Sequence, residues 1–140
     1  MSFREKSAWA FLLLFSLTGA FYAWEVGGAW LVNGDAPKPS FKLAKVYIGF
    51  VLIGAIVSQY VLARSAGDEA DAPADEREQI AIYKAGNWSG IILGFGVVTG
   101  VIHFYQYDDG RLMFHIIVGF LMLSQILEYA LQIRFFRRGV

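Results

Sequence analysis

The chain has 140 residues, of which 56% are hydrophobic and 17% charged, so its composition suits the interior of a membrane better than water. Twelve basic and twelve acidic residues give a formal net charge of zero, which argues against nucleic-acid binding. The absence of cysteine excludes disulfides, thiolate metal sites and cysteine nucleophiles.

Four apolar runs make up 96 of the 140 residues, and each is long enough to cross a bilayer core about 30 Å thick. They are Ala8–Val32, Ala44–Ala63, Ile80–Tyr105 and Leu112–Phe136. The runs lack the alternation of an outer-membrane barrel, and helices satisfy every backbone polar group internally. We therefore expect an all-α integral membrane protein, a single four-transmembrane-helix bundle over residues 1–140. The expected helices are about 8–32, 44–63, 76–106 and 111–136.

The first run could also belong to a signal peptide. Arg4 and Lys6 precede it, and Thr18 and Ala20 fit a small-residue cleavage site. The run continues to Trp30, past the roughly 7–15 residues of a signal core, so we expect the first helix to be retained.

Basic residues are divided unevenly between the two sides of the membrane. With four spans, both termini and the middle loop share one side. That side carries Arg4, Lys6, Arg64, Arg77, Lys84, Arg134, Arg137 and Arg138, against Lys38, Lys42, Lys45 and Arg111 on the other. Eight against four predicts that both termini are cytoplasmic.

The longest polar stretch is an acidic loop over residues 65–79, expected in the cytoplasm. Its acidic residues are Asp68, Glu69, Asp71, Asp75, Glu76 and Glu78. Asp75 and Glu78 stand three residues apart, as an N-cap and its reciprocal partner do, so the third helix should begin at Asp75. The loop is either a solvated linker or a docking site for a basic partner.

Glycines recur at helical spacing in two of the runs. They are Gly86, Gly90, Gly94, Gly96 and Gly100 in the third run, and Gly19 and Gly27 in the first. Rows of small residues let membrane helices approach closely. We expect these glycines to pack helices together inside the bundle; the alternative is a homodimer seam on the third helix.

Three ionisable residues should lie near the outer membrane face: Glu25, His103 and His115. Ionisable residues inside a span are expensive and mark candidate functional sites. The three could bind a divalent metal, and the two histidines could ligate haem. A proton or quinone site is a third reading. Nearby tyrosines are Tyr22, Tyr47 and Tyr105. Because such residues are also common at membrane interfaces, we expect no cofactor and keep metal or haem as alternatives.

A second polar set should lie in the cytoplasmic leaflet. It consists of Glu128 and Gln125 on the fourth helix, Lys84 and Asn87 on the third, and Arg64 at the end of the second. An unpaired carboxylate at this depth would become protonated, so we expect Glu128 to pair with Lys84 or Arg64. The set would then link helices as polar contacts; the alternative is a proton-coupled carboxylate.

The segments 75–78 (DERE), 85–90 (AGNWSG) and 123–133 (LSQILEYALQI) resemble a family of small four-helix bacterial inner-membrane proteins without established activity. The resemblance covers most of the chain and implies a multi-pass protein of the bacterial inner membrane. Some members are encoded beside a helix-turn-helix regulator, which implies a regulatory role.

A fainter resemblance is to small multidrug resistance transporters, which have four helices, a glutamate in the first and Trp-Ser-Gly in the third. Glu25 and Trp88-Ser89-Gly90 match these features. Unlike in those transporters, Glu25 lies towards the far end of its helix and the middle loop is charged.

No nucleophile–base pairing, phosphate-binding glycine loop or zinc-protease motif occurs in the sequence, so we expect no enzyme. We expect a non-catalytic inner-membrane protein, surrounded by lipid, that serves as an accessory or regulatory subunit by binding a membrane or cytoplasmic protein. One alternative is a small proton-coupled transporter using Glu25 or Glu128. The other is a metal- or haem-binding redox protein using His103 and His115.

Overall fold

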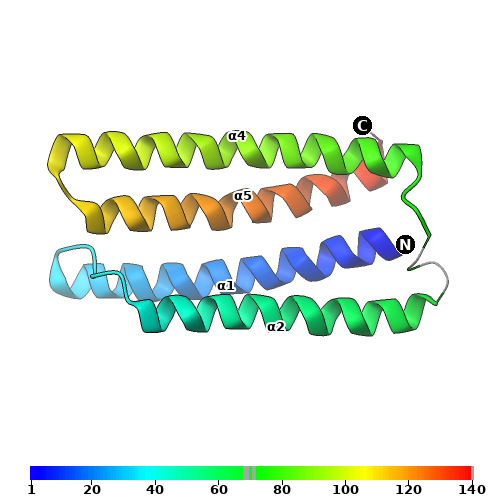
Figure 1. The fold of residues 1–140 in the computed structure, drawn as a ribbon, viewed down its shortest axis with the longest axis horizontal. Coiled ribbons are helices and arrows are strands. Elements are labelled where there is room, and N and C mark those ends of the chain that lie inside the picture. Colours follow the sequence, from blue (N-terminus) through cyan, green and yellow to red (C-terminus); the bar gives the residue numbers. More distant parts are fainter. Residues whose placement is uncertain (68–69, 71, 140) are drawn as a thin grey trace.

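The computed structural model describes residues 1–67, 70 and 72–139, and within them it is all α-helical (Figure 1). Its helices are α1 (Phe3–Asn33), α2 (Phe41–Ala66), α4 (Glu76–Tyr107) and α5 (Gly110–Arg138). All four are long and apolar enough to cross a membrane, which confirms the predicted fold class. Asp68, Glu69 and Asp71 of the predicted acidic loop lie outside the described residues.

Each helix begins at a polar side chain that accepts a hydrogen bond from the backbone of its first turn. These caps are Ser2, Ser40, Asp75 and Asp109. Asp75 and Glu78 form the capping box that their spacing predicts. Because such caps lie beyond the apolar runs, α1 starts at Phe3 rather than at about 8, and α2 extends from Phe41 to Ala66.

The helices form an open row in the order α4, α5, α1, α2 (Figure 1). The most extensive packing is between α4 and α5, followed by α1 on α5 and α1 on α2. The chain exposes 9225 Å² of surface, against about 7,200 Å² expected for a water-soluble protein of this mass. Large apolar side chains such as Leu31 and Ile56 are exposed, as expected for a surface that faces lipid.

Small side chains fill the closest contacts between helices. Ala8, Ala81, Ala85 and Ser124 are almost completely buried. Lipid gives helices no hydrophobic reason to associate, so close packing between small residues holds such a bundle together.

Both termini and the start of α4 lie at one end of the row, and the α1–α2 and α4–α5 connections lie at the other (Figure 1). Within the described part of the chain, two ion pairs cross the first end. Arg4 Nε lies 3.0 Å from Glu78 Oε2, and Arg137 Nε lies 2.6 Å from Glu5 Oε1. These pairs connect α1 to the start of α4 and to the end of α5.

Candidate functional site

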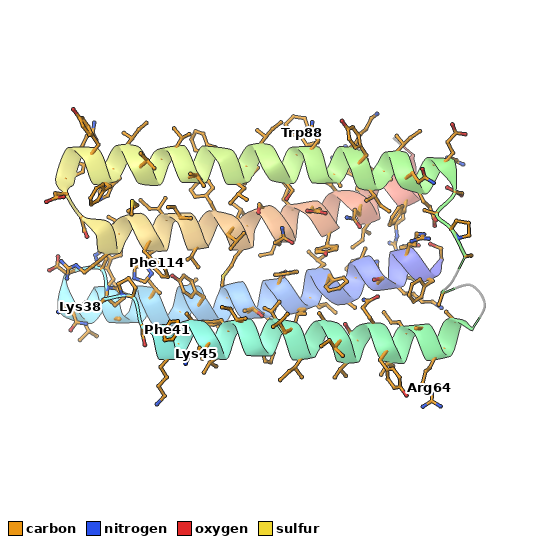
Figure 2. The ribbon with its side chains drawn as sticks, in the orientation of Figure 1. Lys38, Phe41, Lys45, Arg64, Trp88 and Phe114 are labelled. Carbon is orange, nitrogen blue, oxygen red and sulfur yellow. The ribbon has the colours of Figure 1, made fainter. Side chains whose placement is uncertain are left out.

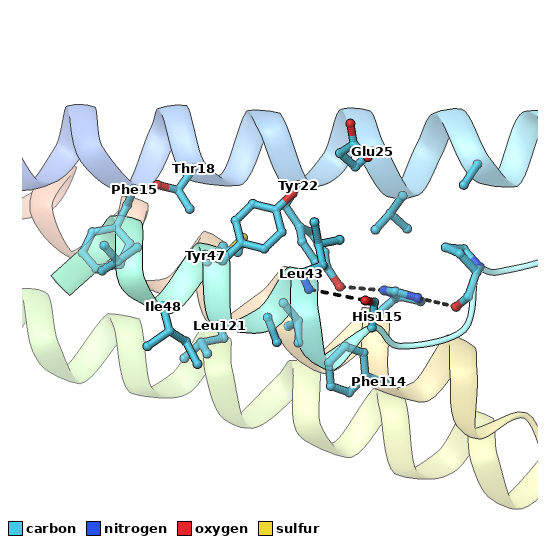
Figure 3. A pocket seen from close by; sticks show the side chains of 18 of the residues that line it. Phe15, Thr18, Tyr22, Glu25, Leu43, Tyr47, Ile48, Phe114, His115 and Leu121 are labelled. Carbon is cyan, nitrogen blue, oxygen red and sulfur yellow. Dashed lines mark hydrogen bonds between the residues drawn. The ribbon is translucent and has the colours of Figure 1, made fainter. Parts of the chain in front are cut away.

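A cavity of about 580 Å³ opens between α1, α2 and α5, beside the α1–α2 connection (Figure 3). Its walls are mainly apolar, because each helix turns one apolar face towards it at helical spacing. The polar residues in its lining include Thr18, Tyr22, Glu25, Tyr47, His115 and Gln125. The cavity is a candidate site for a small apolar ligand.

His115 on α5 forms hydrogen bonds with α1 and with the segment that joins α1 to α2 (Figure 3). Its Nδ1 lies 2.6 Å from the Tyr22 hydroxyl oxygen, and its Nε2 lies 2.8 Å from the Pro37 carbonyl oxygen. A carbonyl can only accept, so Nε2 donates to Pro37; in the neutral ring Nδ1 then accepts from Tyr22. Both ring nitrogens are therefore occupied. A metal or haem iron would have to displace the Tyr22 hydroxyl to bind the lone pair of Nδ1.

The structure does not bring Glu25, His103 and His115 together. Glu25 and His115 both line the cavity, but the Glu25 side chain is exposed and points away from the His115 ring (Figure 3). His103 lies outside the cavity lining, with its ring 4.8 Å from that of Tyr107. Among residues 1–67, 70 and 72–139, no three histidine, aspartate or glutamate side chains are placed to hold a metal.

The second polar set is also dispersed. Glu128 accepts a hydrogen bond from Gln132 Nε2 at 3.3 Å, one turn further along α5. Arg64 donates to the Tyr60 hydroxyl at 3.3 Å and points away from the other helices (Figure 2). Within the described part of the chain, Glu128 forms no ion pair with Lys84 or Arg64.

The missing ion pair has a simple geometric reason. Arg64 belongs to α2 at the edge of the row, and α1 lies between α2 and α5 (Figure 1). Lys84 and Asn87 are exposed on α4, while Gln125 lines the cavity. Their positions in the sequence predict one level of the membrane, but Arg64 lies on a helix that does not face α5, and Lys84 lies on the exposed side of α4.

The glycines fall into two groups. A Cβ added at Gly96 would overlap Phe120, one at Gly100 would lie 3.0 Å from Ile117 Cγ1, and one at Gly19 would lie 3.5 Å from Ile126 Cδ1. These three glycines pack helices inside the chain, as predicted.

The other predicted packing glycines have open space where a side chain would be. No neighbouring atom lies within 4 Å of a Cβ built at Gly27, Gly86, Gly90 or Gly94. They do not pack helices within the described chain, so the expectation of packing inside the bundle fails for them. Gly94 and Gly96 differ because two residues turn a helix by about 200°, which places them on opposite faces.

Asn87 lies on the same open side of α4 as Gly90 and Gly94, three and seven residues before them. At 1.5 Å per residue it is about 10 Å past Ile80, where the third apolar run begins, and so within the cytoplasmic half of the span. Its side chain is exposed, and among the described residues it has no hydrogen-bond partner. Trp88 points away from α5 beside it (Figure 2).

Tyr47 has a larger role in the cavity than the sequence indicates, where it is only one of three tyrosines near the ionisable residues. Its side chain is 7% exposed, and its hydroxyl is buried with no hydrogen-bond partner in the described part of the chain. Its ring meets the Tyr22 ring edge-on at 5.4 Å, at the wall of the cavity (Figure 3). The signal in the sequence was its place inside the second apolar run, where a phenol hydroxyl needs a partner.

Asp109 lies outside the spans, in the turn between α4 and α5. Its carboxylate accepts hydrogen bonds from the backbone N–H groups of Leu112 at 3.2 Å and Arg111 at 3.0 Å. The bond from Leu112, helped by the bond and charge of Arg111, holds the pKa of Asp109 below its ordinary value. The backbone hydrogen bonds at the start of α5 therefore favour the ionised form of Asp109.

Comparisons of the chain with protein-family models, curated proteins and solved structures found no match. The resemblances seen in the sequence stay predictions. The cavity and the open face of α4 are the two features of this multi-pass membrane protein that bear on its function.

Proposed function

We propose that the chain is a non-catalytic subunit of a membrane complex, and that it binds another transmembrane helix through the outer face of α4. The outer face is defined by Tyr83, Asn87, Gly90, Gly94 and Val98. These residues are spaced by three or four and lie opposite the side of α4 that packs on α5.

The open space at Gly90 and Gly94 is the observation that carries the proposal. A glycine is about 0.8–1.0 kcal/mol less favourable than alanine inside a helix, so a row of them needs a compensating contact. In membranes that contact is usually the close approach of a second helix. Within the described residues, α5 does not supply it at these positions.

Asn87 supports a second copy of the chain as the helix that docks there. An exposed amide inside a span is costly unless it is hydrogen-bonded. The amide both donates and accepts, so two Asn87 side chains can pair across a two-fold axis. Two copies in one membrane have the same orientation, so identical residues of α4 meet at such a seam.

We place this assembly in the bacterial inner membrane, with both termini in the cytoplasm, on the strength of the basic-residue distribution and the family resemblance. There the dimer serves as an accessory or regulatory unit. The absence of catalytic sequence motifs supports a role through binding rather than through chemistry.

Subunit counting tests the proposal. Fluorescently labelled protein is diluted in lipid vesicles, and the dimer fraction is read by energy transfer. Gly90→Leu should weaken the dimer roughly tenfold, since it blocks the approach of the second helix. Gly49→Leu is the matched control, because Gly49 on α2 also has open space around it.

The dimer fraction of Gly49→Leu should equal that of the unmodified chain. A monomer at every protein-to-lipid ratio would overturn the proposal. Equal dimer fractions for Gly90→Leu and Gly49→Leu would overturn the assignment of the outer face.

A further inference from the structure

We propose that the cavity between α1, α2 and α5 binds a neutral amphiphile, whose apolar body fills the cavity and whose carbonyl or hydroxyl oxygen accepts a hydrogen bond from Tyr47. This inference concerns a different face of the molecule from the dimer seam and goes beyond the proposed function. It can hold or fail independently of that seam.

The cavity has the dimensions of a small-molecule site. Its volume of about 580 Å³ lies within the roughly 300–1,000 Å³ typical of ligand pockets. Aliphatic side chains such as Ile48, Val51 and Leu121 form much of its wall. These walls suit a hydrocarbon body rather than a polar metabolite.

The unpartnered hydroxyl of Tyr47 indicates which polar group the ligand carries. Two of the other polar groups in the lining are already bonded within the protein: the Thr18 hydroxyl donates to the Leu14 carbonyl at 2.7 Å, and the Tyr22 hydroxyl bonds His115. The buried Tyr47 hydroxyl has no partner among the described residues, and an unmade buried hydrogen bond is destabilising. This hydroxyl is covered in the structure, so a ligand oxygen in the cavity would satisfy it after a small rotation of the Tyr47 side chain.

Gln125 offers a second contact to the same ligand. Its amide lines the cavity from α5 and is half-buried, with no hydrogen bond to another described residue. An amide and a phenol together recognise a group that both donates and accepts, or two separate oxygens on one head group.

The charges near the cavity favour a ligand without net charge. Glu25 and Lys38 both line it, carry opposite signs and are exposed. An ionised head group would therefore meet no net opposite charge, and moving it into an apolar cavity would cost far more than moving a neutral one.

This chemistry could come from the ester carbonyl of a glycerolipid or from a free lipophile such as a quinone. Two photoreactive probes separate these sources. One is a benzoquinone with a diazirine on a decyl chain, and the other is a phosphatidylcholine with a diazirine on one acyl chain. Each is added to the full chain in lipid nanodiscs, irradiated, and mapped by mass spectrometry of the labelled peptides.

We expect at least one probe to label peptides of α1, α2 and α5 at the cavity. Tyr47→Phe should reduce that labelling roughly fivefold, because it removes one neutral hydrogen bond. Tyr60→Phe is the matched control: Tyr60 lies on the same helix but is exposed outside the cavity, so labelling should not change. Labelling by the quinone alone identifies a free lipophile, and labelling by the phospholipid alone identifies a glycerolipid.

Tyr47→Phe should fold normally, since its hydroxyl bonds no described residue. Ala44→Phe is a second variant that fills the cavity and should abolish labelling there by size alone. Labelling spread evenly over the lipid-facing surface would overturn the inference. Equal labelling of the cavity in Tyr47→Phe and the unmodified chain would overturn the role of Tyr47.

Discussion

The two faces of α4 carry glycines in different surroundings. Gly96 and Gly100 lie against Phe120 and Ile117 of α5, whereas Gly90 and Gly94 face open space. All of them share the spacing that lets membrane helices approach closely. The difference teaches that such spacing predicts a close approach but not the identity of the approaching helix. On one face that helix belongs to the same chain, and on the other we infer a second copy.

Among substitutions that test this difference, the largest change in unfolding free energy is expected at Gly96. Gly96→Ala would overlap the base of the Phe120 side chain, which cannot swing aside, so the α4–α5 contact must open. Overpacking of this kind costs about 1–3 kcal/mol of unfolding free energy. The measurement is the midpoint of denaturation in detergent at a dilution that keeps the chain monomeric.

Gly94→Ala is the matched change on the outer face. In the monomer it meets no neighbour and should be neutral, or more stable by up to about 1 kcal/mol from helix propensity. If both substitutions lowered the midpoint equally, the two faces of α4 would not differ as the structure describes.

A smaller effect is expected at Gly54 on α2, a packing glycine that the sequence analysis did not single out. A Cβ there would lie 2.6 Å from Leu14 Cδ1 of α1. The tip of a leucine can rotate away, so Gly54→Ala should cost about 1 kcal/mol or less. Combining it with Leu14→Ala should remove the coupling between the two sites, as a double-mutant cycle of denaturation midpoints would show.

Asn87→Leu should act on the dimer and not on the monomer. Interhelical hydrogen bonds in membranes average about 0.6 kcal/mol, so the dimer should weaken roughly threefold. Gln106→Leu is the control, since Gln106 is an exposed amide of the same helix away from the outer face. An equal loss of energy transfer in both variants would show that general polarity, not the outer face, controls association.

The smallest expected effect is on stability as a function of pH, through Asp109 in the turn between α4 and α5. The pKa of Asp109 is lowered in the folded state, chiefly by the backbone hydrogen bond from Leu112. The stabilisation is therefore complete above the unfolded pKa of about 3.9 and is lost as the pH falls through the folded value.

Asp109→Asn keeps a capping side chain but cannot ionise. The stability advantage of the unmodified chain over this variant should be present at neutral pH and disappear in acid. A constant difference from neutral to acidic pH would show that the charge of Asp109 contributes nothing.

The local features of the fold could be predicted from the sequence. The four spans follow from apolar length, and the Asp75–Glu78 capping box follows from spacing. These features depend on residues close together in the chain, so no knowledge of the neighbouring helices is needed.

The rotation and order of the helices could not be predicted in the same way. In lipid, the buried and exposed faces of a helix are both apolar, so hydropathy does not show which side of α4 meets α5. The expected partners of Glu128 failed for the same reason: nothing in the sequence shows that α1 separates Arg64 on α2 from α5, or that Lys84 lies on the exposed side of α4. The unsatisfied hydroxyl of Tyr47 likewise becomes visible only once its neighbours are placed.

The most direct test of the outer face is disulfide cross-linking between copies. The chain has no cysteine, so single substitutions report without background. Tyr83→Cys and Val98→Cys lie on the outer face of α4, and Ile53→Cys lies on the exposed side of α2 as the control.

Oxidation in native membranes should convert the two α4 variants to covalent dimers and leave the α2 variant monomeric. Dimers that form equally at all three positions, or only through α2, would contradict the account of α4 as the surface that meets a second copy.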